Sequence, residues 1–283
     1  MTAGSRSTES APGELSFSFG RNWRRFVDGV TDEAIREAEA SLTEFMEIPD
    51  LRGRTFVDVG CGSGLFSYAA FKLGAKRIVS LDLDELCVEC CRQWREKAGS
   101  PGSWEIQKGN VLDRSFLSTL GRFDVVYSWG VLHHTGQMWQ AIANSMELVD
   151  AGGFYYIALY NKAEGRRGSA YWLNRKRRYL EAPSLLRRAM EWEHMTRFLL
   201  RSLIRLRNPI AQIRAYRRKR GMAWRTNVID WLGGYPYEFA SVPEVLKYVT
   251  RTRAGLSLVN LKATNDLANN WFLFRQSAHQ DIP

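Results

Sequence analysis

The sequence predicts an α/β protein built on a seven-stranded, mostly parallel sheet with helices on both faces, and a helical insert after the fifth strand. Three observations carry this prediction. Short apolar runs of strand length alternate with helical patterns, which is typical of βαβ units. Three alternating glycines, Gly60, Gly62 and Gly64, follow the first run directly. Polar residues follow each of the first five runs, at the carboxyl ends of the expected strands. In parallel sheets, ligands bind at these ends.

The elements are expected in a regular order. A first helix begins at Thr31 or Asp32, either of which can cap it, and Ile35, Ala38 and Leu42 recur at helical spacing. The last two strands are expected to form a hairpin at the sheet edge. Strands are expected over 54–60, 77–84, 104–113, 122–130, 152–161, 255–263 and 269–276, and helices over 32–46, 64–74, 85–94, 137–149 and 241–251.

The 283 residues are long enough for one large domain with an insertion. The polar start lacks the apolar segment of a signal peptide and is expected to be a disordered tail. The expected parts are the tail over 1–14, an N-terminal helical cap over 15–50, a cofactor-binding core over 51–161, a basic helical insert or lid with a substrate loop over 162–240, and closing elements of the core over 241–283.

The cysteines favour a cytoplasmic location. Cys61, Cys87, Cys90 and Cys91 lie close together, and three share one expected helix, which is not a secreted disulfide framework. The C-x-x-C-C group has no second half-site, so we expect buried apolar thiols and no metal. No apolar run approaches the roughly 20 residues that cross a bilayer.

The net charge of +10 is concentrated in one segment. Residues 162–225 hold 19 Lys and Arg against 4 Asp and Glu, a net charge of +15, whereas the rest of the chain carries −5. A body of ordinary charge therefore carries a strongly cationic insert.

The glycine loop fits a nucleotide-like cofactor. Glycines let the backbone turn sharply and approach a ligand closely. Asp82 lies 20 residues beyond Gly62, the distance at which an acidic residue meets ribose hydroxyls. Asp58, two residues before Gly60, would repel a pyrophosphate but suits a ligand with an ammonium group. A purely structural turn is the alternative.

These residues carry a family resemblance. The segments FVDVGCGSGLFS, LDLD, GNVLD and FDVVYSWGVLHH resemble successive motifs of the class I S-adenosylmethionine-dependent methyltransferases, over about residues 55–161. The resemblance implies a Rossmann-like fold and S-adenosyl-L-methionine as cofactor. It places Asp58 near the ammonium group and Asp82 on the ribose, while Asn110 stands where an acid often takes the adenine. The implied cofactor-binding residues are Asp58, Gly60, Cys61, Gly62, Asp82, Leu83, Asn110, Val111 and Trp129.

Methyl transfer mainly needs a nucleophile aligned with the sulfonium methyl group. A nucleophile of high pKa also needs a base, and His133 and His134 are the available imidazoles. Tyr237 and Glu238 complete the expected catalytic set. The alternative for the GVLHH segment is a strand end whose polar residues face water.

Two further segments are expected to touch the substrate. In NVIDWLGGYPYEFAS, carboxylates, aromatic faces and hydroxyls around a Gly-Gly-Tyr-Pro turn can orient a cationic or hydroxylated substrate, or the aromatics can simply anchor the insert. In FSFGRNWRRF, Phe19, Asn22 and Trp23 either close over the cofactor or pack on the core. The expected substrate-binding residues are Asn22, Trp23, Tyr160, Asn161, Asp230 and Tyr235.

The amphipathic, arginine-rich insert leaves three alternatives: a lid whose apolar face covers the active site, an RNA-binding surface, or attachment to an anionic membrane. The predicted function is methylation of a small metabolite at nitrogen or oxygen, in biosynthesis. The alternative is a tRNA- or RNA-modifying methyltransferase, since YSWGVLHH also resembles wobble-uridine tRNA-modifying proteins. No stable protein partner is implied.

Overall fold

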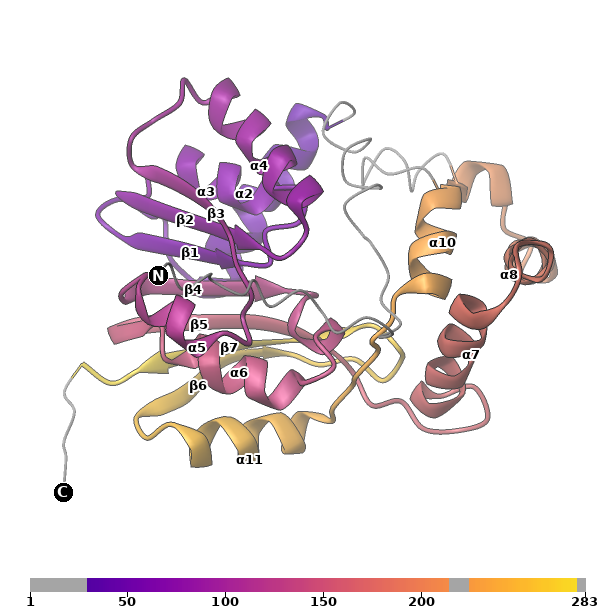
Figure 1. Ribbon diagram of the computed structural model, residues 1–283. Coiled ribbons are helices and arrows are strands. Elements are labelled where there is room, and N and C mark those ends of the chain that lie inside the picture. The colour runs from indigo at the N-terminus through magenta and orange to yellow at the C-terminus, as the bar shows by residue number, and fades with distance from the viewer. Residues whose placement is uncertain (1–29, 214–223, 279–283) are drawn as a thin grey trace, which may run out of the picture.

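The computed structural model describes residues 30–213 and 224–278. Its centre is one seven-stranded sheet with the strand order β3-β2-β1-β4-β5-β7-β6 (Figure 1). The strands β1 to β5 are parallel, and β7 runs antiparallel to both β5 and β6. The bounds are β1 Thr55–Val59, β2 Arg77–Asp82, β3 Trp104–Lys108, β4 Phe123–Trp129, β5 Val149–Tyr160, β6 Leu256–Lys262 and β7 Asn269–Gln276. The predicted α/β fold class is confirmed.

Helices cover both faces of the sheet because its central strands are apolar on both sides. In β1, Phe56 packs with α2, α3 and α4, while Val57 and Val59 pack with α5, α6 and α11. The bounds are α2 Asp32–Met46, α3 Leu65–Lys72, α4 Glu85–Lys97, α5 Arg114–Ser118, the 3₁₀ turn η1 Leu132–His134, α6 Met138–Met146 and α11 Val242–Thr252. In open α/β sheets a ligand binds at the carboxyl ends of the strands, at the point where the strand order reverses. In this sheet that point lies between β1 and β4.

The first helix follows its sequence signals. Thr31 caps α2, and its side-chain oxygen accepts a hydrogen bond from the Ala34 amide at 3.2 Å. Ala38 and Leu42 are buried as the periodicity predicts, together with Ala34 and Met46. The predicted range of 32–46 is therefore confirmed.

The closing strands form the expected hairpin at the sheet edge, with β6 outermost and β7 between β5 and β6. The strands expected over 77–84 and 104–113 end at Asp82 and Lys108, because Asp84 and Asp113 already cap the helices α4 and α5. Two further expectations are wrong. The predicted helix over 137–149 ends at Met146, because Val149 already pairs with Phe123 and begins β5. The segment NVIDWLGGYPYEFAS, expected to supply the substrate loop, begins as a helix, because α10 (Trp224–Gly233) continues through Asn227 to Gly233.

The insert contains α7 Ser169–Glu181, α8 Ser184–Ile204 and α10 Trp224–Gly233, which lie together beside the sheet (Figure 1). They have a small core of their own, formed by the buried Tyr179, Val228 and Leu232 with partly buried side chains around them. Pro183 stands at the break between α7 and α8. Within the described part of the chain, no helix is both long and apolar enough to cross a membrane.

Candidate functional site

The glycine loop after β1 has the backbone that its sequence predicts. Gly60, Gly62 and Gly64 have φ angles of 78°, 53° and 78°, in the left-handed region that side chains disfavour. At Gly60 an added Cβ would lie 2.3 Å from the Val131 Cγ1 atom. The loop after β1 and the segment after β4 therefore approach each other as closely as only a glycine permits.

Asp82, at the end of β2, holds this loop in place. Its Oδ2 accepts a hydrogen bond from the Gly62 amide at 2.9 Å, and its Oδ1 accepts one from the Asp84 amide at 2.9 Å. Burial raises the pKa of the carboxyl, and the two amides oppose that rise. The Cys87 thiol also hydrogen-bonds to this carboxylate, and the lone pairs that the two amides and the thiol leave free could accept from a ligand hydroxyl.

Asp58 ends a buried chain of hydrogen bonds that has one direction. The Trp104 Nε1–H group can only donate, and it donates to Ser80 Oγ at 2.9 Å. Ser80 donates to Ser67 Oγ at 2.7 Å, and Ser67 donates to Asp58 Oδ2 at 2.6 Å. Because this series of hydrogen bonds runs in one direction, the Ser67 hydroxyl always donates to Asp58, whose side chain is buried at 2% exposure. Burial nevertheless raises the pKa of Asp58 to about 7, so a neighbouring ammonium group would stabilise its charged form.

The remaining predicted cofactor residues lie at the carboxyl ends of the strands β1 to β4. Asn110 Oδ1 accepts from the Leu112 amide at 2.9 Å, and Asp113 caps α5 by accepting from the Phe116 amide at 3.0 Å. Both oxygens therefore shape the turn after β3. Cys61 and Val111 are buried, Trp129 packs edge-on against Trp271, and Leu83 is 52% exposed beside Asp82. Their role toward a cofactor stays a prediction.

The histidine pair lies after β4 on the turn η1. His133 is fully buried, and its Nδ1 accepts from the Tyr160 amide at 3.2 Å, so its proton is on Nε2. That Nε2 has no hydrogen-bond partner among the described residues. His134 Nδ1 lies 2.6 Å from the Pro236 carbonyl and donates to it. Burial lowers the pKa of both rings, that of His134 to about 3, so both are neutral at pH 7.

Lys176 of α7 enters the same cluster from the insert. Its side chain is fully buried and donates to the Trp231 carbonyl. The ammonium lies 4.3 Å from the Trp231 ring centroid and 4.8 Å from that of Tyr237. Burial lowers the pKa of Lys176 to about 7. The aromatic faces predicted to hold a cationic substrate thus hold a cation of the chain itself, which favours the anchoring alternative for Trp231 and Tyr237.

The segment after α10 packs against the histidines. Tyr160, at the end of β5, has its ring centroid 4.0 Å from that of His133 and 5.0 Å from that of Tyr237. Both carboxylate oxygens of Glu238 accept from the Met138 amide, at 3.0 and 3.1 Å, which fixes the start of α6. The structure thus brings His133, His134, Tyr160 and Tyr237 together and gives Glu238 a structural partner.

Other predicted substrate residues take different positions. Asn161 is buried, and its side chain donates to the Asp266 carbonyl at 2.9 Å and accepts from Asn270 at 3.1 Å. It therefore ties β5 to the β6–β7 loop. Asp230 lies on α10 and favours the charged form of Lys176, while the Tyr235 hydroxyl accepts from Arg177 at 3.4 Å. Asn22 and Trp23, like Phe19, lie outside the described residues.

Sequence reasoning missed three residues. Lys176 stands in a basic run that gives no sign of burial. Ser67 and Asn269 are uncharged and so were not singled out as site residues. Only Asn269 could have been found from the sequence, because it begins the antiparallel strand β7 next to the carboxyl end of β5. The Asn269 Oδ1 atom is buried and has no partner among the described residues.

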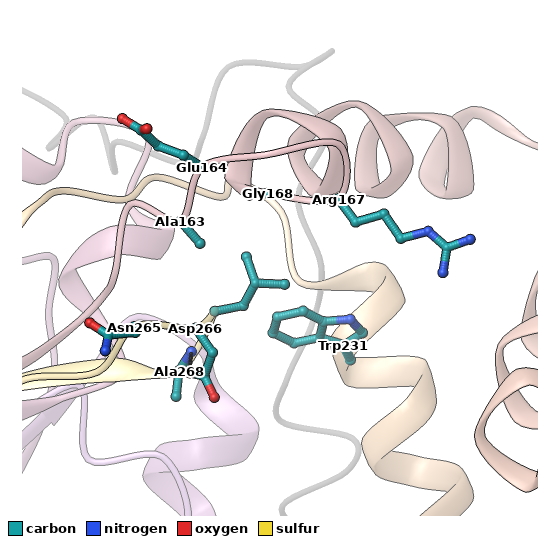
Figure 2. A pocket seen from close by; sticks show the side chains of 9 residues that line it. Ala163, Glu164, Arg167, Gly168, Trp231, Asn265, Asp266 and Ala268 are labelled. Carbon is teal, nitrogen blue, oxygen red and sulfur yellow. Dashed lines mark hydrogen bonds between the residues drawn. The ribbon is translucent and has the colours of Figure 1, made fainter. Parts of the chain in front are cut away.

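A pocket of about 510 Å³ opens at the carboxyl end of β5. The Trp231 indole points into it from α10, whereas the Glu164 carboxylate points away (Figure 2). Trp231 thus separates the pocket from the cluster of Lys176, Tyr160 and Tyr237. The lining residues are Ala163, Glu164, Arg167, Gly168, Trp231, Asn265, Asp266, Leu267 and Ala268.

The comparisons with known proteins agree with this geometry. Residues 57–157 match a family model described as a methyltransferase domain. The chain carries a class I S-adenosylmethionine-dependent methyltransferase domain. This family uses S-adenosyl-L-methionine as its cofactor. The left-handed glycine loop, the Asp82 lone pairs and the buried Asp58 carboxylate fit that group.

Curated relatives match the methyltransferase domain over short stretches. A ribosomal protein L11 methyltransferase of Tolumonas auensis is 38% identical over 67 residues, which is 24% of this chain and 23% of the relative. A ubiquinone biosynthesis O-methyltransferase of a Methylobacterium species is 30% identical over 112 residues, 40% of this chain and 43% of the relative. The chain therefore spans less than half the length of these relatives.

Solved structures share the fold. The magnesium protoporphyrin IX methyltransferase of Synechocystis PCC 6803, with bound S-adenosylhomocysteine, superposes with a TM-score of 0.53 at 15% identity, covering 91% of this chain and 94% of that one. An O-methyltransferase family protein of Burkholderia thailandensis gives 0.51 at 15% identity, covering 87% and 58%. At such identity the likeness shows the fold alone.

The cysteines of the methyltransferase domain are free and buried, as predicted. Cys61 hydrogen-bonds with the Cys91 thiol, and this bond together with burial raises the pKa of Cys61. Over residues 30–213 and 224–278, no group of three His, Cys, Asp or Glu side chains gathers to hold a metal ion.

Proposed function

We propose that this protein transfers the methyl group of S-adenosyl-L-methionine to a nitrogen or oxygen of a small molecule. The observation that carries the proposal is the 510 Å³ pocket that lies beside Trp231 and the end of β5. Its volume is within the range of small-molecule sites. The loop after β1, the histidine turn after β4 and this pocket share one edge of the sheet.

The chain's own residues would hold the two reactants. Asp82 would accept the ribose hydroxyls through its remaining lone pairs, and Asp58 would face the ammonium group. When bound, the cofactor supplies an activated methyl group on its sulfonium. The main task left to the protein is to align the nucleophile and exclude water.

The acceptor would be a nucleophile that needs no strong base. His133 uses Nδ1 to accept from the Tyr160 amide, so it offers an N–H donor instead of a lone pair. Burial lowers the pKa of His134 to about 3, which makes its neutral ring a weak base. An uncharged amine, a phenolate or a carboxylate would meet this condition, whereas an aliphatic alcohol would not.

An RNA substrate is the second candidate, because residues 162–225 carry a net charge of +15. Phosphate contacts by arginine would produce affinity for bulk tRNA that falls steeply with salt. Negligible tRNA binding at low salt would remove this candidate.

The first experiment is calorimetric titration with S-adenosylhomocysteine, followed by a co-crystal structure with it. Release of S-adenosylhomocysteine from S-adenosylmethionine is then measured with a low-molecular-weight metabolite fraction and, separately, with bulk tRNA. We expect binding, and turnover with the metabolite fraction. Absence of binding would refute the cofactor assignment, and turnover with tRNA alone would refute the small-molecule assignment.

A further inference from the structure

The long helix α8 exposes an apolar stripe along its whole length. Leu185, Trp192, Leu199 and Leu203 are spaced by seven, seven and four residues and so share one face of the helix. Leu185 is 82% exposed, Trp192 67% and Ile204 80%. The exposed apolar side chains of this face are Leu185, Leu186, Trp192, Leu199, Leu200, Leu203 and Ile204.

The orientation of α8 is set by its opposite face. Glu191 and Ser202 are buried, and the Tyr179 hydroxyl donates to Glu191 at 2.8 Å. Met190 and Met195 pack on the small core of the insert. The helix therefore uses a second, separate face for folding, and the apolar stripe is left for something else. Because α8 packs on α7 and α10 beside the sheet, its position argues against the lid alternative for this helix (Figure 1).

Cationic side chains border the stripe. Arg188 lies along one side, and Arg197 and Arg201 lie along the other, by helical spacing. Glu193 lies on the stripe itself, seven residues from both Leu186 and Leu200, and forms ion pairs with Arg175 and with Arg197, the latter at 2.5 Å. These pairs compensate its negative charge. The face is therefore apolar along its length apart from this ion-paired acid, and Arg188 and Arg201 make its margins positive.

We propose that α8 docks this protein on an anionic lipid surface, lying flat with the apolar stripe in the headgroup boundary. A helix with leucine and tryptophan on one side and arginine beside them has the composition of interfacial helices. Twenty-one residues make about 30 Å of helix.

The charge and the apolar character of this face together favour an anionic lipid surface over the other possible partners. RNA phosphates would pair with the arginines but would leave the leucines in water. A second copy of the chain would cover the leucines but would bring arginine margins against arginine margins. An anionic lipid surface satisfies both parts of the face. The proposal does not depend on the identity of the methyl acceptor.

The test is co-sedimentation of the full chain with vesicles of phosphatidylcholine, with or without about one third phosphatidylglycerol. We expect binding to the anionic vesicles that weakens with salt, and at least about tenfold less binding to phosphatidylcholine alone. The double variant Leu185→Gln and Leu203→Gln should lose binding. The matched control, Leu258→Gln with Val259→Gln on β6, replaces exposed apolar residues elsewhere and should bind as the original protein does.

Thermal unfolding followed by circular dichroism should be the same for both double variants, since all four side chains are exposed. No sedimentation of the original protein with anionic vesicles would overturn the proposal. Equal sedimentation of the α8 variant would also overturn it. A vesicle-free dimer that the α8 variant abolishes, seen by light scattering without vesicle binding, would assign the stripe to a second copy instead.

Discussion

The Gly62 amide donates to Asp82 Oδ2 at 2.9 Å, which joins the loop after β1 to the end of β2. The residue that is expected to meet the ribose therefore also shapes the glycine loop that is expected to bind the cofactor. Loss of the carboxylate would remove a ligand contact and release the loop at the same time.

We expect Asp82→Ala to weaken S-adenosylhomocysteine binding by about 100-fold or more, because two loop bonds and the hydroxyl acceptors are lost together. Asp82→Asn keeps one oxygen and should bind with intermediate affinity. Glu105→Ala, an exposed position on β3, is the control. Calorimetry checks all three, and unchanged affinity in Asp82→Ala would contradict the assignment.

Gly60→Ala should destabilise the protein more than Gly53→Ala does. Both glycines have positive φ, 78° and 75°, so both variants incur the same left-handed strain, about 1–2 kcal/mol. A Cβ at Gly60 also meets Val131 at 2.3 Å, whereas one at Gly53 meets nothing within 4 Å. Urea unfolding measures the difference, and the double variant Gly60→Ala with Val131→Ala should recover part of it. Equal losses in both single variants would show that the close approach is unimportant.

Asp58→Asn should stabilise the ligand-free protein at pH 8 and weaken cofactor binding. The folded pKa of about 7 lies above the ordinary value of 3.8, so the folded state binds the proton more tightly. The contribution of Asp58 to stability is therefore present below pH 3.8 and is lost as the pH rises through about 7. We expect the substitution to gain a few kcal/mol at pH 8 and little at about pH 4. Urea unfolding at several pH values checks this, and a difference that does not change with pH would contradict it.

Lys176→Met should stabilise the protein at pH 6, on the order of 2 kcal/mol, because it removes a buried ammonium group. The folded pKa of about 7 lies below 10.5, so the stability of the original protein rises as the pH increases from about 7 toward 10. The advantage of the variant should shrink over that range. Lys162→Met, at an exposed ion pair, should show no such trend between pH 6 and 9. A constant advantage would mean that Lys176 does not titrate near 7.

Much of this protein could be predicted from sequence, because the signals are local. The Thr31 cap, the strand lengths, and the glycine loop with Asp82 twenty residues on depend on residues near one another in the chain. Such short-range preferences act on the backbone directly. The α/β class followed from them, whereas the methyltransferase domain was predicted from the resemblance of the motifs to that family.

Tertiary packing decided the rest. Three facts could not be predicted from the sequence: that β7 lies between β5 and β6, that Lys176 is buried against Trp231 and Tyr237, and that Asn161 ties β5 to the β6–β7 loop. Nor could it show which apolar face of α8 packs inward and which stays exposed. The burial and hydrogen-bond partners of a side chain depend on residues distant in the chain, so its pKa, its tautomer and its exposure emerge only when those residues meet.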